Sequence, residues 1–151
     1  MTTPQQQIEQ DLTAAMKARE KVKVSTLRLL LTAIKNERIR IGEDVDETTF
    51  LHLVQNAIKQ RQDSVEQYRQ GNREDLAAKE ESEAKILSAY LPPPVGEDEI
   101  RTAIEEFVAA EALVGVKGMG AVMKEMLTRF SGRTDGGTIN RIARDILTET
   151  D

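Results

Sequence analysis

The sequence predicts an all-α protein with two helical domains, an N-terminal segment of four helices and a C-terminal bundle of three helices. Alanine, leucine, glutamate, lysine, glutamine and arginine dominate the chain, and these residues favour helices. Aromatic residues make up only 3% of the chain and tryptophan is missing, so the large side chains that favour sheets are scarce. Glycine and proline punctuate stretches in which apolar residues recur at helical spacing.

Four helices are predicted in residues 1–91. The first follows Thr3 and Pro4, which suit a helix cap and a first turn. A short joint is expected around residues 20–23, and Gly42 ends the second helix. The apolar stripes contain Ile8, Leu12, Ala15 and Met16 in the first helix, and Val24, Leu27, Leu29, Leu30, Leu31, Ile34 and Ile41 in the second.

The third and fourth helices follow a loop with capping acids at residues 42–46. Between them, Gly71 and Asn72 indicate a turn, so the two helices are expected to form an antiparallel hairpin. Their stripes contain Phe50, Val54, Ala57, Ile58, Val65 and Tyr68 in the third helix, and Leu76, Ala77, Ala84, Leu87 and Leu91 in the fourth.

Three consecutive prolines from Pro92 to Pro94 mark the domain boundary, because they cannot continue a helix. Residues 92–96 are therefore expected to be a semi-rigid hinge, and residues 97–151 a C-terminal domain. Acidic residues open its first helix, where they complement the helix dipole. The three stripes contain Ile100, Ile104, Phe107 and Val108, then Met119, Val122, Met126, Leu127 and Phe130, then Ile139, Ile142, Ala143 and Ile146.

The net charge is −5 and its distribution is uneven. Basic and acidic residues number 11 and 10 in residues 1–71, 4 and 11 in residues 72–111, and 6 and 5 in residues 112–151. This balance is unlike that of a protein that binds duplex DNA along its length, so any nucleic-acid contact is expected to be local. The N-terminus has no signal-peptide pattern and no segment is apolar enough to span a membrane, so a cytoplasmic location without membrane contact is expected.

The sequence offers little chemistry. His52 is the only histidine, is expected on an exposed helix face, and has no cysteine to join it in a transition-metal site. The carboxylates of Glu80 and Glu83 share a charged helix face and are expected to be solvated. No serine lies in a nucleophile elbow. We therefore expect no metal site, no cofactor and no catalytic centre, with a carboxylate-bound Mg²⁺ as the one metal that these residues leave open.

A cluster of basic residues and glycines occupies the last forty residues. Arg141 and Arg144 share a helix face close to Arg133 in the preceding turn. Gly136 follows Asp135, a candidate N-cap, so the helix start there is either an ordinary cap or an acceptor for an RNA phosphate. The basic residues form either a cationic patch or a solvated face, and no aromatic residue is placed to stack on bases. The candidate nucleic-acid-binding residues are Lys117, Lys124, Arg129, Arg133, Gly136, Arg141 and Arg144.

Several motifs carry a family resemblance. Gly120, Val122, Met123, Gly132, Arg133, Asp135, Asn140 and Arg144 match the tail domain of the B subunit of glutamine-dependent aminoacyl-tRNA amidotransferase. Over its whole length the chain resembles the YqeY family, which shares that tail. The resemblance rests further on Ser25 to Arg28, Ile58 to Ser64, Tyr68 to Gly71, Arg73 to Leu76, and Tyr90 to Pro92.

The resemblance implies a partner rather than a reaction. In the amidotransferase the tail helps to hold tRNA, while catalysis belongs to domains and subunits that have no counterpart in this chain. A label of carbon–nitrogen ligase with glutamine as amido donor would thus be inherited through the tail alone. Relatives often carry lysine where this chain has Gly137, and the loss of that charge weakens the implied tRNA contact.

Three hypotheses follow. The leading one is a non-catalytic helical protein that binds tRNA, or a tRNA-amidotransferase or aminoacylation complex, through its tail. The second is a protein-interaction module that docks through the long N-terminal helices. The third, a glutamine-dependent enzyme, would require ammonia release by the purified chain.

Overall fold

The computed structural model describes residues 2–150, and within that range every regular element is a helix, as the sequence predicts. The helices are α1 (Pro4–Lys17), α2 (Lys21–Ile41), α3 (Glu47–Gln70), α4 (Glu74–Ser88), α5 (Glu97–Ala110), a 3₁₀ turn η1 (Val116–Gly118), α6 (Met119–Arg129) and α7 (Gly136–Glu149). They form two compact units that divide between Leu91 and Pro92, the N-terminal unit and the C-terminal unit. The proposed domain limits and a hinge at residues 92–96 stay predictions.

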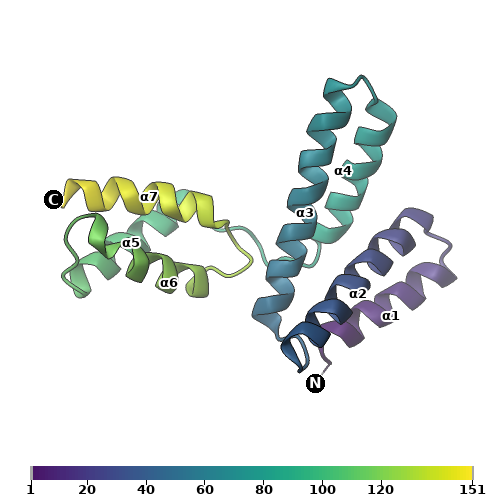
Figure 1. The fold of residues 1–151 in the computed structure, drawn as a ribbon, viewed down its shortest axis with the longest axis horizontal. Coiled ribbons are helices and arrows are strands. Elements are labelled where there is room, and N and C mark those ends of the chain that lie inside the picture. Colours follow the sequence, from purple (N-terminus) through teal and green to yellow (C-terminus); the bar gives the residue numbers. More distant parts are fainter. Residues whose placement is uncertain (1, 151) are drawn as a thin grey trace. The chain divides into compact units, whose positions relative to one another are not determined.

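The N-terminal unit consists of two helical hairpins, α1 with α2 and α3 with α4 (Figure 1). The predicted hairpin of the third and fourth helices is therefore confirmed. Thr3 caps α1 as expected, because its hydroxyl accepts the Gln6 amide N–H at 3.1 Å while the Gln6 side chain accepts the Thr3 N–H. Asp46 caps α3 by accepting the Thr49 N–H at 2.8 Å.

Left-handed residues form the tight turns of this unit. Gly42 ends α2 with φ +78°, and Asn72 has φ +59° in the turn before α4. The joint after α1 lies at residues 18–20, earlier than the predicted 20–23, because Arg19 reverses the chain with φ +60°. Residues 21–23 instead belong to the first turn of α2.

The N-terminal core is built on the predicted stripes with two corrections. Leu29 is 57% exposed and Met16 is also exposed, so neither belongs to the core. In α2, each residue turns the helix by about 100°, and the buried Leu30 thus leaves its neighbour Leu29 on the outer side. The main buried cluster of the N-terminal unit consists of Ile8, Ala15, Leu27, Leu30, Ile34, Val45, Phe50, Leu51, Val54 and Leu87, and Ala77 of α4 is buried as well.

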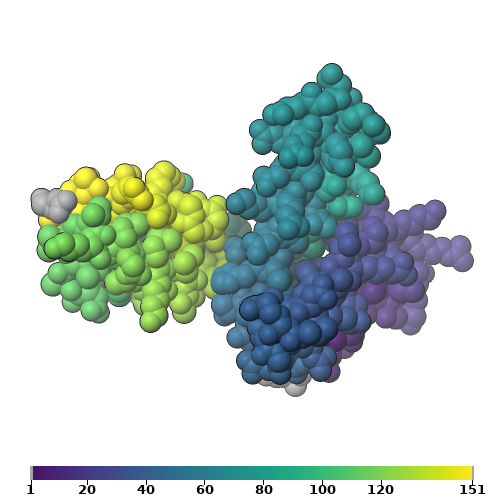
Figure 2. Space-filling model, viewed as in Figure 1, coloured from purple at the N-terminus to yellow at the C-terminus, as the bar shows by residue number. Residues whose placement is uncertain are grey.

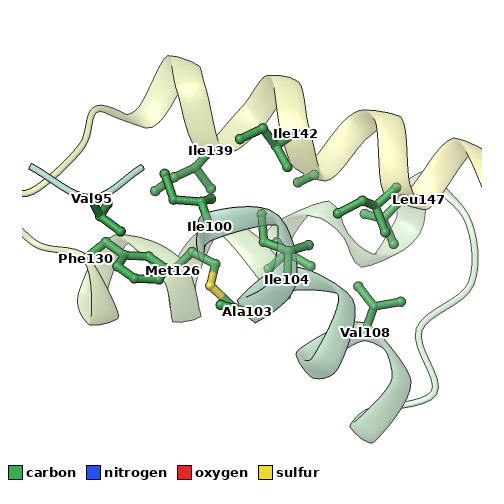
Figure 3. Packing of buried hydrophobic residues seen from close by; sticks show 13 residues of the cluster. Val95, Ile100, Ala103, Ile104, Val108, Met126, Phe130, Ile139, Ile142 and Leu147 are labelled. Atoms are coloured by element: carbon green, nitrogen blue, oxygen red, sulfur yellow. The ribbon is translucent and has the colours of Figure 1, made fainter. Parts of the chain in front are cut away.

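The C-terminal unit packs α5, α6 and α7 around one apolar core, in which their side chains point toward one another (Figure 3). Gly118 allows a close approach, since a Cβ there would lie 3.1 Å from the Leu113 Cβ. Leu127, predicted on the apolar face of α6, is exposed. Val95 is buried in this core, although the sequence places it in the hinge. The end of that segment is thus anchored to the C-terminal unit.

Candidate nucleic-acid interface

All seven candidate residues lie in the C-terminal unit, on different elements. Lys117 belongs to η1, and Lys124 and Arg129 belong to α6. Arg133 lies in the loop before α7, while α7 itself carries Gly136, Arg141 and Arg144. Amphipathic helices position these side chains: α7 buries Ile139, Ile142, Ala143, Ile146 and Leu147, which leaves both of its arginines exposed.

Arg133 is bound to its own chain. Its Nε–H donates to the Pro93 carbonyl oxygen at 3.1 Å, and one terminal nitrogen lies 3.9 Å from a Glu99 carboxylate oxygen. The Arg133 carbonyl oxygen in turn accepts the Val95 N–H at 2.9 Å. This residue therefore joins the segment before α5 to the loop before α7, a structural role that the sequence did not indicate.

Two further arginines are paired with carboxylates. Arg141 on α7 binds Glu97 at the start of α5, and Arg129 binds Glu125 one turn earlier on α6 with an N–O distance of 3.1 Å. All four side chains are exposed to solvent or partly so. Exposed pairs of this kind contribute about 0–1 kcal/mol each, so an incoming phosphate can compete for the arginines.

The remaining cations are less engaged. Arg144 makes a long hydrogen bond, 3.4 Å, to the Asn140 side-chain oxygen. Lys117 and Lys124 are exposed, and in the part of the chain that the structure describes neither they nor Arg144 form an ion pair. These three residues are the cations most open to a ligand.

The start of α7 forms the ordinary cap that was one of the two predicted alternatives. The Asp135 carboxylate accepts the Thr138 N–H at 2.7 Å and lies close to Gly137, 3.4 Å from where a Cβ would stand. A phosphate at this helix start would meet that carboxylate. Gly136 is half-buried, and a Cβ there would only touch Leu127.

A shallow groove of about 570 Å³ runs beside Arg129 and Arg133. Its apolar floor is formed by Ala103 and Phe130, and carboxylates outnumber guanidinium groups around it. Its lining consists of Asp98, Glu99, Thr102, Ala103, Glu106, Arg129, Phe130 and Arg133. Sequence reasoning missed these acidic neighbours, which come from α5 and lie more than twenty residues from the arginines.

The net charge of the C-terminal unit affects the binding of a polyanion as much as the individual ion pairs do. Residues 92–151 contain seven basic and eleven acidic side chains, a net charge of −4. A polyanion would therefore meet a small local set of cations on an acidic unit, and its binding would depend steeply on salt.

The carboxylate pair of α4 differs from expectation. Glu83 is buried, only 6% exposed, rather than solvated, and its carboxylate lies 3.5 Å from the Arg61 Nε on α3. Burial, followed by repulsion from Glu80, raises the pKa of Glu83, while Arg61 lowers it. The Arg61 Nη1–H also donates to the Ala57 carbonyl oxygen of the same helix at 3.1 Å, and the contact with Glu83 joins α3 to α4.

The remaining chemistry of the described residues is sparse. His52 is exposed, as predicted. Between residues 2 and 150, no three histidine or carboxylate side chains gather closely enough to hold a metal ion. In the same range, no helix combines the length and the apolar character needed to cross a bilayer.

Comparison with known proteins gives a nearly full-length match to a protein family. A family model described as "Yqey-like protein" matches residues 5–147. Among curated proteins, "Altered inheritance of mitochondria protein 41, mitochondrial" from Vanderwaltozyma polyspora is 39% identical over 104 residues, covering 67% of this chain and 56% of the relative. Its namesake from Lachancea thermotolerans is 38% identical over the same extent.

A third relative of the same name, from Saccharomyces cerevisiae, is 37% identical over 82 residues, which cover 54% of this chain and 44% of the relative. The chain thus spans about half the length of the curated relatives it matches.

Proposed function

Because the chain belongs to the YqeY family, we propose that it is a non-catalytic helical module that contacts tRNA, alone or within a tRNA-amidotransferase or aminoacylation complex, through its C-terminal unit. The observation that carries this proposal is a set of three exposed cations that form no ion pair within residues 2–150, Lys117, Lys124 and Arg144. The resemblance of the tail to the amidotransferase B subunit supports tRNA as the ligand.

The contact would be to the RNA backbone. Lysine and arginine side chains bind phosphates without reading sequence, and the half-buried Phe107 and the buried Phe130 of this unit belong to its core. The acidic balance of the unit opposes a polyanion, so the expected binding is weak and strongly salt-dependent.

The location of the chain is a separate proposal. We keep the cytoplasm as the proposed compartment, whereas the names of the fungal relatives contain the word mitochondrial. Both compartments contain tRNA, so the proposed contact does not depend on this choice.

Filter binding of total tRNA across a salt series tests the proposal. Replacing Lys117, Lys124 and Arg144 together by alanine should lower the log–log salt slope by about 2, because each lost phosphate contact removes at most about one unit. The matched control replaces Lys59, Lys79 and Lys85, three exposed lysines of the N-terminal unit, by alanine.

The proposal requires the control variant to keep the slope of the unaltered protein. An equal loss in both triple variants would mean that only the total charge matters. A flat binding curve for the unaltered protein at low salt would remove the proposal altogether.

A further inference from the structure

The most basic helix of the chain is α2, in the N-terminal unit. Its 21 residues contain six lysines and arginines and a single acid, Glu37. The helix packs into the unit through Leu27, Leu30 and Ile34, which are buried on one side. The opposite side is exposed, and part of it is visible as dark blue surface in Figure 2.

The exposed side of α2 carries a seven-residue (heptad) repeat whose residues do not belong to the core. Two rows alternate along it at spacings of three and four residues, as the a and d positions of a coiled coil do. We call these residues the α2 seam: Val22, Leu29 and Asn36 in one row, and Ser25, Thr32 and Ile39 in the other. All six are exposed, with 57% of Leu29 and 80% of Ile39 open to solvent.

A row of cations borders the seam. Lys21, Arg28 and Lys35 each precede a residue of the first row, which is the position called g in a coiled coil. They are seven residues apart, so successive charges stand about 10.5 Å apart along one edge of the helix. All three are exposed, and none has an ion pair among residues 2–150.

We propose that the α2 seam docks an α-helix of a partner protein, one that carries apolar residues on one face and carboxylates along one edge. A spacing of 10.5 Å is two turns of any α-helix, so glutamates or aspartates seven residues apart on the partner would meet the three cations in register. Apolar partner residues would cover Val22, Leu29 and Ile39, which are exposed to solvent.

The row of cations and the mixed apolar and polar residues of the α2 seam together favour an acidic amphipathic helix over other negatively charged partners. A nucleic-acid backbone would pair with the cations and leave Leu29 and Ile39 in water. A lipid surface would draw Ser25, Thr32 and Asn36 toward the acyl chains along with the apolar residues. A helix satisfies both sets, and Asn36 at a seam position would fix the register.

The opposite edge of the α2 seam carries no comparable row of unpaired charges. The residues that follow the second row are Thr26, which is buried, the half-buried Ala33, and Arg40, which is paired with Glu37. On this edge the N-terminal unit covers Thr26 and part of Ala33, and Glu37 neutralises the exposed Arg40. The charge of a partner helix would therefore be recognised only by Lys21, Arg28 and Lys35.

Two synthetic peptides test the inference with the full chain. Each has three heptads with leucine at a and d, and the e and g positions are glutamate in one peptide and lysine in the other. We expect fluorescence anisotropy to report binding of the glutamate peptide, and at least about tenfold weaker binding of the lysine peptide, since three attractive pairs become repulsive.

Charge exchange makes the test specific. The variant Lys21→Glu/Arg28→Glu/Lys35→Glu should reverse the preference and bind the lysine peptide. The control Lys59→Glu/Lys79→Glu/Lys85→Glu, with the same change in charge on exposed sites of α3 and α4, should keep the preference for glutamate. Replacing Leu29 and Ile39 by glutamine should weaken the binding of the glutamate peptide about tenfold with no change in preference.

Three results would overturn the inference: no binding of either peptide, an unchanged preference after charge exchange, or equal effects in the control. Binding of total tRNA or of phosphatidylserine vesicles through the three cations, with no effect of the glutamine changes, would also overturn it and assign the face to a polyanion. The peptide assay contains no RNA and probes the N-terminal unit, so its outcome is independent of the tRNA proposal.

Discussion

Arg133 illustrates how one side chain is committed by its surroundings. The sequence predicts it as a phosphate ligand, whereas the structure shows it donating to the Pro93 carbonyl oxygen and facing Glu99. A hydrogen bond to a carbonyl forty residues away in the sequence has no signature in local spacing. The most open cations of the predicted set are instead Lys117, Lys124 and Arg144.

Tyr90 offers a test at the same scale. Its hydroxyl donates to an Asp11 carboxylate oxygen at 2.6 Å, and its ring meets Phe50 edge to face with centroids 6.1 Å apart. Tyr90→Phe keeps the ring contact and removes the charge-assisted hydrogen bond, so urea unfolding should show a loss of about 1–2 kcal/mol at pH 7.

The raised pKa of Tyr90 also sets the direction in which the stability difference between the two proteins changes with pH. Burial, then the Asp11 hydrogen bond, raises the pKa of Tyr90 far above its ordinary value of 10.0. The stabilisation is thus complete below pH 10 and is lost as the pH rises toward the folded value. The difference between the two proteins should shrink above pH 10, and a constant difference from pH 7 to pH 11 would refute the assigned hydrogen bond.

Between elements, the pair Arg61–Glu83 carries a second test. Arg61→Ala would leave the buried Glu83 carboxylate without its cation, so unfolding should cost about 3 kcal/mol less at pH 7. Because the pKa of Glu83 is already raised, protonation relieves this defect on acidification, and the loss should shrink as the pH falls toward the ordinary carboxyl value of 4.5.

The control for this pair is Arg69→Ala, since Arg69 also pairs with acids of α4 but is exposed. That change should cost less than about 1 kcal/mol. Equal losses in the two variants would show that the buried pair is worth no more than an exposed one.

At the scale of elements, the helices could be predicted and several side-chain environments could not. Glycine, proline and capping residues such as Thr3 and Asp46 act locally, so the sequence carries the ends of the helices within a few residues. Leu29 was predicted in the core but is exposed, because an apolar side chain on a long helix does not itself show which face is buried. Glu83 was predicted to be solvated but is buried, because its partner Arg61 comes close only when α3 packs against α4.

The candidate site was only half visible in the sequence for the same reason. Its cations lie in one stretch, whereas Glu97 and Glu99, which neutralise Arg141 and Arg133, come from another helix. The basic face of α2 was missed for a different reason. Charges summed over residues 1–71 nearly cancel, and only a count per helix reveals six cations against one acid.

For the whole molecule, charge decides what each unit can bind. The N-terminal unit is close to neutral overall but carries six of its fourteen lysines and arginines on α2, while the C-terminal unit is acidic and exposes a few cations. The two proposals therefore address different surfaces, a helix-docking seam and an RNA-contacting set, and each can stand or fall alone.

The most direct test of the tRNA contact frees the arginines instead of removing them. In the variant Glu97→Gln/Glu125→Gln, Arg141 and Arg129 lose their carboxylate partners. The net charge of the C-terminal unit becomes less negative by two. Filter binding at low salt should show total tRNA bound about tenfold more tightly, with a steeper salt slope, because two more cations face the phosphates. The matched control Glu43→Gln/Glu66→Gln on the N-terminal unit should bind as the unaltered protein does. Unchanged affinity in the first variant, or an equal gain in the control, would contradict a tRNA contact at this unit.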